Sequence, residues 1–215
     1  MTPSCILFDL DGTLVDSANA ICDAASAAFG ELQVLVDAAE IRPHLGAPLE
    51  ELFQTFVGSS DDTRFDLFVR HYIRLHDEHP EAIPDALPGV RETLDDMTNQ
   101  WGVPFGVATT KPSDRAAQQL QAIGLAHYFH HIQGTDEGMR PKPSPDVILA
   151  ALDKLGQAAS KSVWMVGDTN RDIEAAHEAG LTAILISYSQ QSVQERPTFG
   201  ADHCITHMSQ LISSI

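Results

Sequence analysis

Residues 4–16, SCILFDLDGTLVD, decide the fold, because four consecutive apolar residues run directly into an acidic turn that begins with Asp9, Leu10 and Asp11. A short apolar run that ends at Gly12 is typical of a strand buried on both faces and followed by a tight loop. Asp9 and Asp11 are two residues apart, so both project to one side at the carboxyl edge of the sheet, where open α/β sheets bind ligands. Two carboxylates this close repel each other unless a cation lies between them. The pair therefore predicts a site for a hard divalent ion, Mg²⁺.

The composition indicates an ordinary globular protein with a strongly acidic balance. The 215 residues are 43% hydrophobic, and 30 acidic residues against 13 basic ones give a formal net charge of −17. This charge repels nucleic acids and anionic membranes at long range. We therefore expect no nucleic-acid or membrane partner, and a local cluster of cations to hold a small anionic substrate.

The cysteines and the N-terminus indicate a cytoplasmic protein with reduced thiols. Cys5, Cys22 and Cys204 form no CxxC pair, which argues against a disulfide framework or a zinc ribbon. The first residues contain no basic segment and only four apolar residues in a row, too few for a signal peptide, and no later run is long enough to span a membrane.

The hydrophobic pattern changes along the chain and predicts two domains. Helices are expected at 18–29, 32–45, 48–56 and 61–79, which makes residues 17–80 an all-helical insertion after the first strand. A proline-rich linker follows, and strands at 103–108, 129–133, 163–166 and 183–186 then alternate with helices at 90–100, 112–123, 144–155 and 172–179. This alternation predicts a Rossmann-like α/β core, 1–16 with 81–215, with a mainly parallel sheet covered by helices on both faces.

Polar residues follow several of these strands. Thr109, Thr110 and Lys111 come after the second strand, Lys142 lies in RPKP after the third, and GDTNRD (167–172) follows the fourth. In a parallel sheet all of these residues reach the same edge. The glycine patterns of dinucleotide-binding folds and of P-loop NTPases are absent from the sequence, so another kind of phosphate site is expected.

The four motifs, in this order and with a helical insertion after the first, closely resemble those of the haloacid dehalogenase-like (HAD) hydrolases over nearly the whole chain. The resemblance implies a Mg²⁺-dependent phosphatase that works through a phospho-aspartate. It implies that Asp9 attacks phosphorus and that Asp11 protonates the leaving group and then activates water. Thr109 is expected to bind the phosphoryl oxygens, and Lys142 to neutralise the charge that they share with Asp9.

The resemblance also implies the metal ligands. Asp9 and Asp168 would supply carboxylate oxygens, Asp11 its main-chain carbonyl, and Asp172 either a ligand or support for the others. Gly12 would let the loop turn tightly around the phosphate.

Several residues point to a subgroup of the family. Asp11 favours a phosphate ester over a haloacid, because members that act on haloacids lack this second aspartate. The position of the helical insertion corresponds to a C1 cap, and TTKP (109–112) and LGAPL (45–49) are similar to segments of phosphoglycolate phosphatases. Phosphoglycolate is therefore the favoured substrate, although Thr110 replaces the usual Asn. The other candidates for substrate contact are Lys111, Arg42 and His44, for which a surface role is an equal alternative.

Two other functions stay open at this point. A β-phosphoglucomutase-like enzyme would return the phosphoryl group to a sugar, and a non-catalytic binding protein would keep only the fold. The sequence leaves open whether the chain is a monomer or a homodimer. The histidines lack the spacing of a zinc site and are expected to be solvated or partly buried.

Overall fold

The computed structural model describes residues 2–58, 62–79, 83–188, 198–213 and 215. The chain divides into two compact units. The first, the α/β unit, combines Met1–Val15 with Ala86–Ile215, and the second, the helical unit, is Asp16–Asp85. Each unit has its own hydrophobic core.

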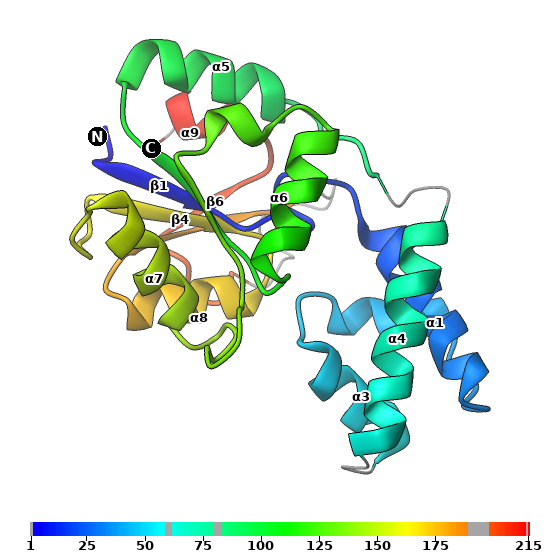
Figure 1. Cartoon of the computed structure of the whole chain (residues 1–215). Helices are drawn as coiled ribbons and strands as arrows, with labels where there is room; N and C mark the ends of the chain where they lie inside the picture. The colour runs from blue at the N-terminus through cyan, green and yellow to red at the C-terminus, as the bar shows by residue number, and fades with distance from the viewer. Residues whose placement is uncertain (1, 59–61, 80–82, 189–197, 214) are drawn as a thin grey trace. The chain divides into compact units, whose positions relative to one another are not determined.

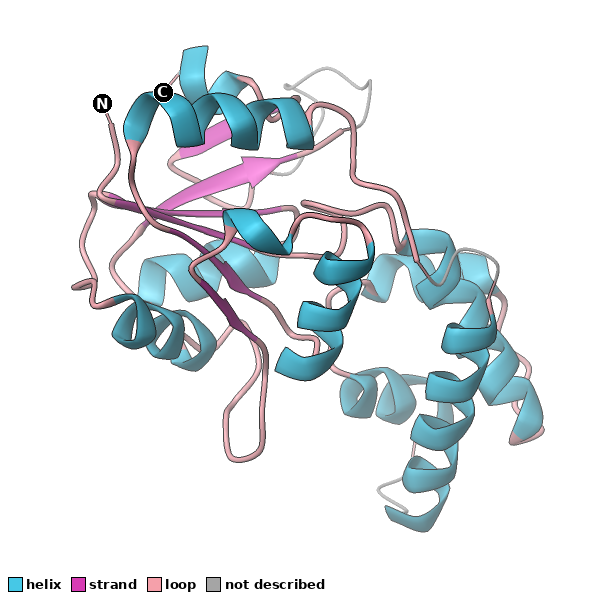
Figure 2. Cartoon of the chain, turned by 45° about the horizontal axis from the view of Figure 1, so that its top comes forward, coloured by secondary structure: helices cyan, strands magenta, loops and turns pink. Residues whose placement is uncertain are grey.

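A six-stranded sheet forms the centre of the α/β unit, and every neighbouring pair of its strands is parallel (Figures 1 and 2). Its strands in spatial order are β3 (His131–Gln133), β2 (Phe105–Ala108), β1 (Cys5–Phe8), β4 (Val163–Gly167), β5 (Thr182–Ile186) and β6 (His203–Ile205). The strand that carries the first acidic motif thus lies between β2 and β4. Parallel pairing brings the carboxyl ends of these three strands to one edge.

Helices cover both faces of this sheet (Figure 1). Successive strand residues point to opposite faces, so Ile6 and Phe8 enter one core cluster while Cys5 and Leu7 enter the other. The first cluster also contains residues of α5 (Val90–Trp101), α6 (Ser113–Ala122) and α9 (Gln210–Ser213). The second contains residues of α7 (Asp146–Leu155) and α8 (Asn170–Glu178). The expected α/β fold with helices on both faces is confirmed.

The helical unit contains α1 (Ala18–Glu31), α2 (Ala38–Ile41), the 3₁₀ turn η1 (Arg42–His44), α3 (Leu49–Val57) and α4 (Asp62–Glu78). Aromatic side chains fill its core: Phe29 of α1 stacks on Phe68 of α4 with ring centroids 4.5 Å apart, and Phe53 of α3 lies 5.6 Å from Phe68. Among the described residues, no helix is both long enough and apolar enough to cross a membrane.

Two local expectations were wrong. A continuous helix was expected at 32–45, but only α2 and η1 form there. Gln33 adopts a left-handed φ of 61°, which is incompatible with a continuous right-handed helix. The first helix was expected at 18–29 but continues to Glu31. The short elements β6 and α9 were not predicted, because two of the three residues of β6 are exposed and polar or small.

Candidate active site

The site is built at the carboxyl edge of β1, β2 and β4. Phe8 is in register with Val107 of β2 and with Val166 of β4, and the Asp9 N–H donates to the Val166 carbonyl at 2.9 Å. Residues that directly follow these strands therefore emerge side by side. Asp9, Thr109 and Asp168 occupy such positions, as the sequence led us to expect.

Lys142 is buried, with only 2% of its area exposed, and its ammonium group contacts residues of three of these segments. Its ammonium group donates to Asp9 Oδ1 at 2.7 Å, to the Ala108 carbonyl at 3.0 Å and to Asp172 Oδ1. Burial disfavours the charged ammonium, but the carboxylates of Asp172 and Asp9 outweigh it and raise the pKa of Lys142 above its ordinary value. Lys142 therefore stays charged at neutral pH.

The carboxyl groups of Asp9 and Asp168, which directly follow β1 and β4, have raised pKa values and hold protons more tightly than free aspartates. Burial raises the pKa of Asp9 to about 6, with Asp172 and Asp11 adding to the effect and Lys142 opposing it. Burial, together with the charges of Asp172 and Asp9, also raises the pKa of Asp168 well above its usual range. Both shifts report an excess of negative charge in a space with little water.

Asp172 serves the fold and the site at once. Its Oδ2 accepts the Thr169 N–H at 3.0 Å and the Thr169 hydroxyl at 2.6 Å, which closes a capping box at the start of α8. Its Oδ1 faces Lys142. Both oxygens of this buried carboxylate are thus engaged by protein donors, and Asp172 fixes Lys142 relative to α8.

The turn after β1 fits closely around Asp168. Gly12 has a φ of +82°, and a Cβ atom at this position would collide with the Asp168 carboxylate. The Thr13 hydroxyl donates to Asp168 Oδ1 at 3.1 Å, and the Tyr188 hydroxyl donates to the Thr13 carbonyl at 2.8 Å. Glycine is therefore required at residue 12, and Thr13 orients the carboxylate.

The residues Asp9, Lys142, Asp168 and Asp172 form what we call the inner cluster. Oxygen atoms of its three carboxylates lie within 4.8 Å of one another. One ammonium group balances only one of three carboxylates, and hard divalent cations prefer oxygen ligands. This donor set fits a divalent cation such as Mg²⁺.

A second group of side chains, the outer cluster, consists of Asp11, Lys111 and Gln119. The Lys111 ammonium donates to Asp11 Oδ1 at 3.0 Å and to Gln119 Oε1 at 2.5 Å. The Lys111 N–H donates to the hydroxyl of Thr109, which is itself 98% buried, at 3.3 Å. Lys111 thus lies at the site, with its charge directed at Asp11.

Residues 6–186 match the family model described as haloacid dehalogenase-like hydrolase. The chain belongs to this family. The match spans the inner cluster and the outer cluster, and it confirms the resemblance found in the sequence.

Relatives of this HAD-like hydrolase carry the names of phosphatases. It is 37% identical over 187 residues to the "Probable phosphatase IndB" of Dickeya dadantii, covering 85% of this chain and 80% of that protein. It is 29% identical to the "Pyrophosphatase PpaX" of Oceanobacillus iheyensis, over 98% of this chain and 95% of the relative. It is also 29% identical to the "Phosphoglycolate phosphatase" of Yersinia pseudotuberculosis, over 98% and 92%.

A solved structure extends the similarity to the fold. The hydrolase superposes on a "predicted phosphatase" from Clostridium acetobutylicum with a TM-score of 0.86 and 26% identity, covering 99% of this chain and 98% of the other.

Three candidate residues of the hydrolase, Thr110, Arg42 and His44, belong to neither cluster. Thr110 is half-buried beside Thr109 and Lys111. Arg42 and His44 lie in η1 of the helical unit, where Arg42 Nη2 donates to Asn19 Oδ1 at 2.7 Å and the His44 ring packs edge-on against Phe56 with centroids 5.5 Å apart. Both residues are engaged within their own unit.

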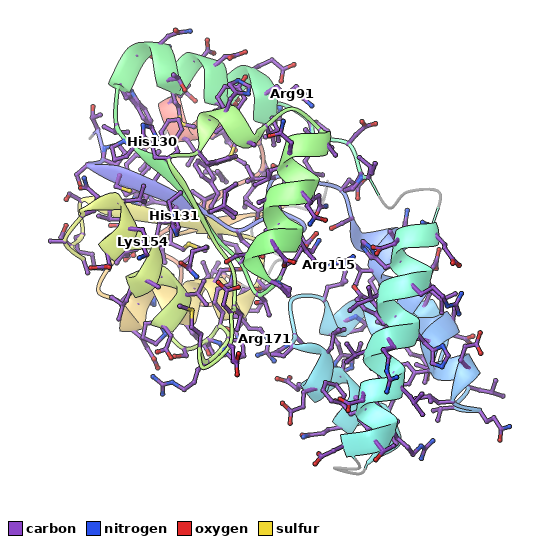
Figure 3. The ribbon with its side chains drawn as sticks, in the orientation of Figure 1. Arg91, Arg115, His130, His131, Lys154 and Arg171 are labelled. Carbon is purple, nitrogen blue, oxygen red and sulfur yellow. The ribbon has the colours of Figure 1, made fainter. Side chains whose placement is uncertain are left out.

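Four residues around the site were not singled out from the sequence. Thr13 directly follows Gly12 in the first motif, whereas Tyr188 and Gln119 lie outside the four motifs and look like ordinary strand-end and helix residues. The fourth, Arg171, has its Nη1 donating to the Lys142 carbonyl at 3.2 Å, and Figure 3 labels it at the beginning of α8. Its position directly before Asp172 in GDTNRD was the available signal.

Proposed function

We propose that this HAD-like hydrolase is a Mg²⁺-dependent phosphatase of a small phosphorylated metabolite, with phosphoglycolate as the first candidate and Asp9 as the nucleophile. One observation carries the proposal: three carboxylates, two of them buried and one half-buried, lie with one buried lysine at the carboxyl edge of β1 and β4. Such a group provides a nucleophile, a site for a cation and a fixed ammonium group within one small volume. The matched family and the names of its relatives support the same class of reaction.

In the first step a carboxylate oxygen of Asp9 attacks phosphorus in line with the leaving oxygen. The Asp9–phosphorus bond forms while the bond from phosphorus to the leaving oxygen breaks, and Asp11 gives its proton to that oxygen. Thr109 would donate its hydroxyl to a phosphoryl oxygen. The Lys142 ammonium, 2.7 Å from Asp9 Oδ1, offsets the negative charge of both reacting groups.

In the second step a water molecule attacks phosphorus of the aspartyl-phosphate. The bond between phosphorus and Asp9 breaks, Asp11 accepts the proton of the water, and inorganic phosphate leaves with Asp9 restored as a carboxylate. The same residue thus serves as acid and then as base.

Asp9 and Asp168, with the main-chain carbonyl of Asp11, would hold the Mg²⁺ ion. When bound, the ion supplies positive charge that offsets repulsion between the phosphate and the Asp9 carboxylate. Asp172 would act by holding Lys142, since both of its oxygens accept hydrogen bonds from protein donors.

Two substrates are candidates, phosphoglycolate and pyrophosphate. TTKP at 109–112 and LGAPL at 45–49 favour phosphoglycolate, and the Yersinia relative carries the corresponding name. The Oceanobacillus relative is named a pyrophosphatase, so pyrophosphate is the second candidate. Residues 17–80 would form the cap of the enzyme, with Arg42 and His44 as candidates for contact with the leaving group.

Phosphate release from a panel of substrates tests this function. The panel contains phosphoglycolate, pyrophosphate, β-glucose 1-phosphate, glucose 6-phosphate and 2,4-dinitrophenyl phosphate, each with Mg²⁺ and with EDTA. We expect Mg²⁺-dependent turnover that Asp9→Asn lowers by at least about 10³-fold, because the nucleophile is lost. Asp16→Asn, an exposed aspartate near the same loop, is the matched control and should keep turnover.

Three outcomes would contradict the proposal. Turnover that survives in Asp9→Asn would exclude the aspartyl-phosphate. Turnover that is equal in EDTA would exclude the metal. Sustained conversion of β-glucose 1-phosphate to glucose 6-phosphate, dependent on a sugar bisphosphate, would identify a mutase.

A further inference from the structure

The contacts of Lys111 in the outer cluster have no role in the reaction steps proposed above. Lys111 is half-buried as a residue, its side chain is only 11% exposed, and its ammonium group has two acceptors, Asp11 Oδ1 at 3.0 Å and Gln119 Oε1 at 2.5 Å. Two acceptors fix the direction of an ammonium group on a flexible side chain far better than one does. The charge of Lys111 is therefore held against Asp11.

Gln119 is an unexpected residue for its position on α6. Its side chain is 9% exposed, and its Nε2 is a buried donor for which the described residues offer no hydrogen-bond acceptor. An unsatisfied buried donor costs about 1–3 kcal/mol, a cost that leucine would avoid. The amide thus reduces the stability of the fold in exchange for one interaction, the bond from Lys111 to its Oε1.

The main chain of Lys111 is fixed as well. Its N–H donates to the Thr109 hydroxyl at 3.3 Å, and its carbonyl accepts the Thr135 N–H at 3.2 Å. A Cβ atom on Gly134 would collide with the same carbonyl, so the loop after β3 lies directly against Lys111. The residue is held at its backbone by the loop after β3 and at its ammonium group by α6.

We propose that Gln119 and Lys111 are positioning residues for Asp11, with Gln119 acting through Lys111. This inference rests on the proposed function, in which a proton passes from the Asp11 carboxyl to the leaving oxygen as the phosphorus–oxygen bond breaks. The fixed ammonium keeps the carboxyl at the end of β1, and it faces the negative charge that remains on Asp11 after the transfer. Lys111 thus has the role of positioning the proton donor, Asp11, and it does not bind the substrate directly.

The leaving group of the substrate distinguishes this role from a structural one. A 2,4-dinitrophenolate ion leaves without a proton, whereas the alkoxide of an alkyl phosphate needs one. We expect Gln119→Leu to lower kcat/KM for the best alkyl phosphate of the panel about tenfold, a part of the 10²–10⁴-fold that a positioned acid contributes. This ratio reports only the steps up to departure of the leaving group, so the later hydrolysis of the aspartyl-phosphate, in which Asp11 acts as base for every substrate, does not enter it. With 2,4-dinitrophenyl phosphate the expected loss is less than about twofold.

The same helix provides a matched control and a rescue. Gln118→Leu changes the exposed neighbour on α6 and should alter neither rate. Gln119→Glu keeps an acceptor oxygen for Lys111 and should restore most of the alkyl-phosphate rate. Lys111→Met should reproduce the selective loss, and the double variant Lys111→Met, Gln119→Leu should be no slower than Lys111→Met alone, because Gln119 acts through Lys111.

Equal losses with both leaving groups, or no loss with either, would overturn the proposal. Detection of the Lys111 ammonium by ¹H–¹⁵N NMR gives a result that does not need turnover. A slowly exchanging signal in the parent protein should disappear in Gln119→Leu and persist in Gln118→Leu, and its persistence in Gln119→Leu also overturns the proposal. Failure of the proposed function is distinguishable, since the parent protein would then release no phosphate from any substrate of the panel.

Discussion

The inner and outer clusters each place one lysine against aspartates at the end of β1, but they differ in charge balance. In the inner cluster Lys142 contacts Asp9 and Asp172 with Asp168 nearby, so two negative charges remain uncompensated. In the outer cluster Lys111 faces Asp11 alone and completes its contacts with a neutral amide. From this difference we expect the inner cluster to bind an external cation, whereas in the outer cluster one ammonium group already faces one carboxylate.

Removal of each lysine tests this comparison with the largest expected effect. Lys142→Met leaves the two buried carboxylates of Asp9 and Asp172 without their cation, and breaking such a pair typically costs about 3–5 kcal/mol of unfolding free energy. Lys111→Met removes a less buried pair and should cost about 1 kcal/mol. Urea unfolding at pH 7 in EDTA measures both values, and similar losses in the two variants would remove the distinction between the clusters.

Added Mg²⁺ should stabilise the inner cluster directly. A ligand that binds only the folded state contributes about 2.7 kcal/mol at 100 times its Kd. Asp168→Asn should abolish this response, because it removes one of the three carboxylates. Asp96→Asn on the exposed side of α5 is the control and should keep the full shift of Tm. A shift of equal size in Asp168→Asn would place the metal elsewhere.

The metal-free protein should lose stability as the pH rises. The folded-state pKa of Asp9 is raised to about 6 from 3.8, and that of Asp168 is raised as well, so between these values the folded state binds more protons than the unfolded state. Unfolding free energy therefore falls with increasing pH across this interval, by an amount on the order of 2 kcal/mol.

Unfolding in EDTA at pH 4.5, 5.5, 6.5 and 7.5 measures this slope. Mg²⁺ should flatten it by supplying the missing positive charge, and Asp9→Asn should reduce it. A stability that rises with pH over the same range in EDTA would show that Lys142 already compensates the cluster.

The inner cluster could be predicted from the sequence because its members follow strands. Asp9, Lys142 and Asp168 come directly after strands or in a proline-flanked loop, and parallel topology brings such positions together whatever the details of packing. The four motifs also follow a known order in the family. For these residues the local pattern and the topology were sufficient.

The contacts of the outer cluster and the interruption near Gln33 in the helical unit could not be predicted from the sequence pattern. Gln119 lies in an ordinary amphipathic helix, and its partner Lys111 is determined by how α6 packs against the loop after β2. The interruption near Gln33 depends on the backbone conformation of one residue that carries no glycine or proline signal. The sequence pattern reports which face of an element is apolar, but it does not report which polar side chains meet across two elements.

The smallest predicted effect concerns a residue that supports the inner cluster from a distance. Tyr188 donates to the Thr13 carbonyl, and Thr13 donates to Asp168, so the tyrosine fixes the turn that orients one of the three carboxylates. Tyr188→Phe should cost about 1 kcal/mol of unfolding free energy, because the buried carbonyl of Thr13 loses a donor. The same substitution at Tyr128, whose hydroxyl donates to Asp95 at the surface, should cost less than about 0.5 kcal/mol. The Mg²⁺ affinity distinguishes a loss of orientation from a loss of packing. The Kd for Mg²⁺, measured by the Tm shift, should rise in Tyr188→Phe and stay unchanged in Tyr128→Phe. An unchanged Kd in both variants would mean that Thr13 orients Asp168 without help from Tyr188.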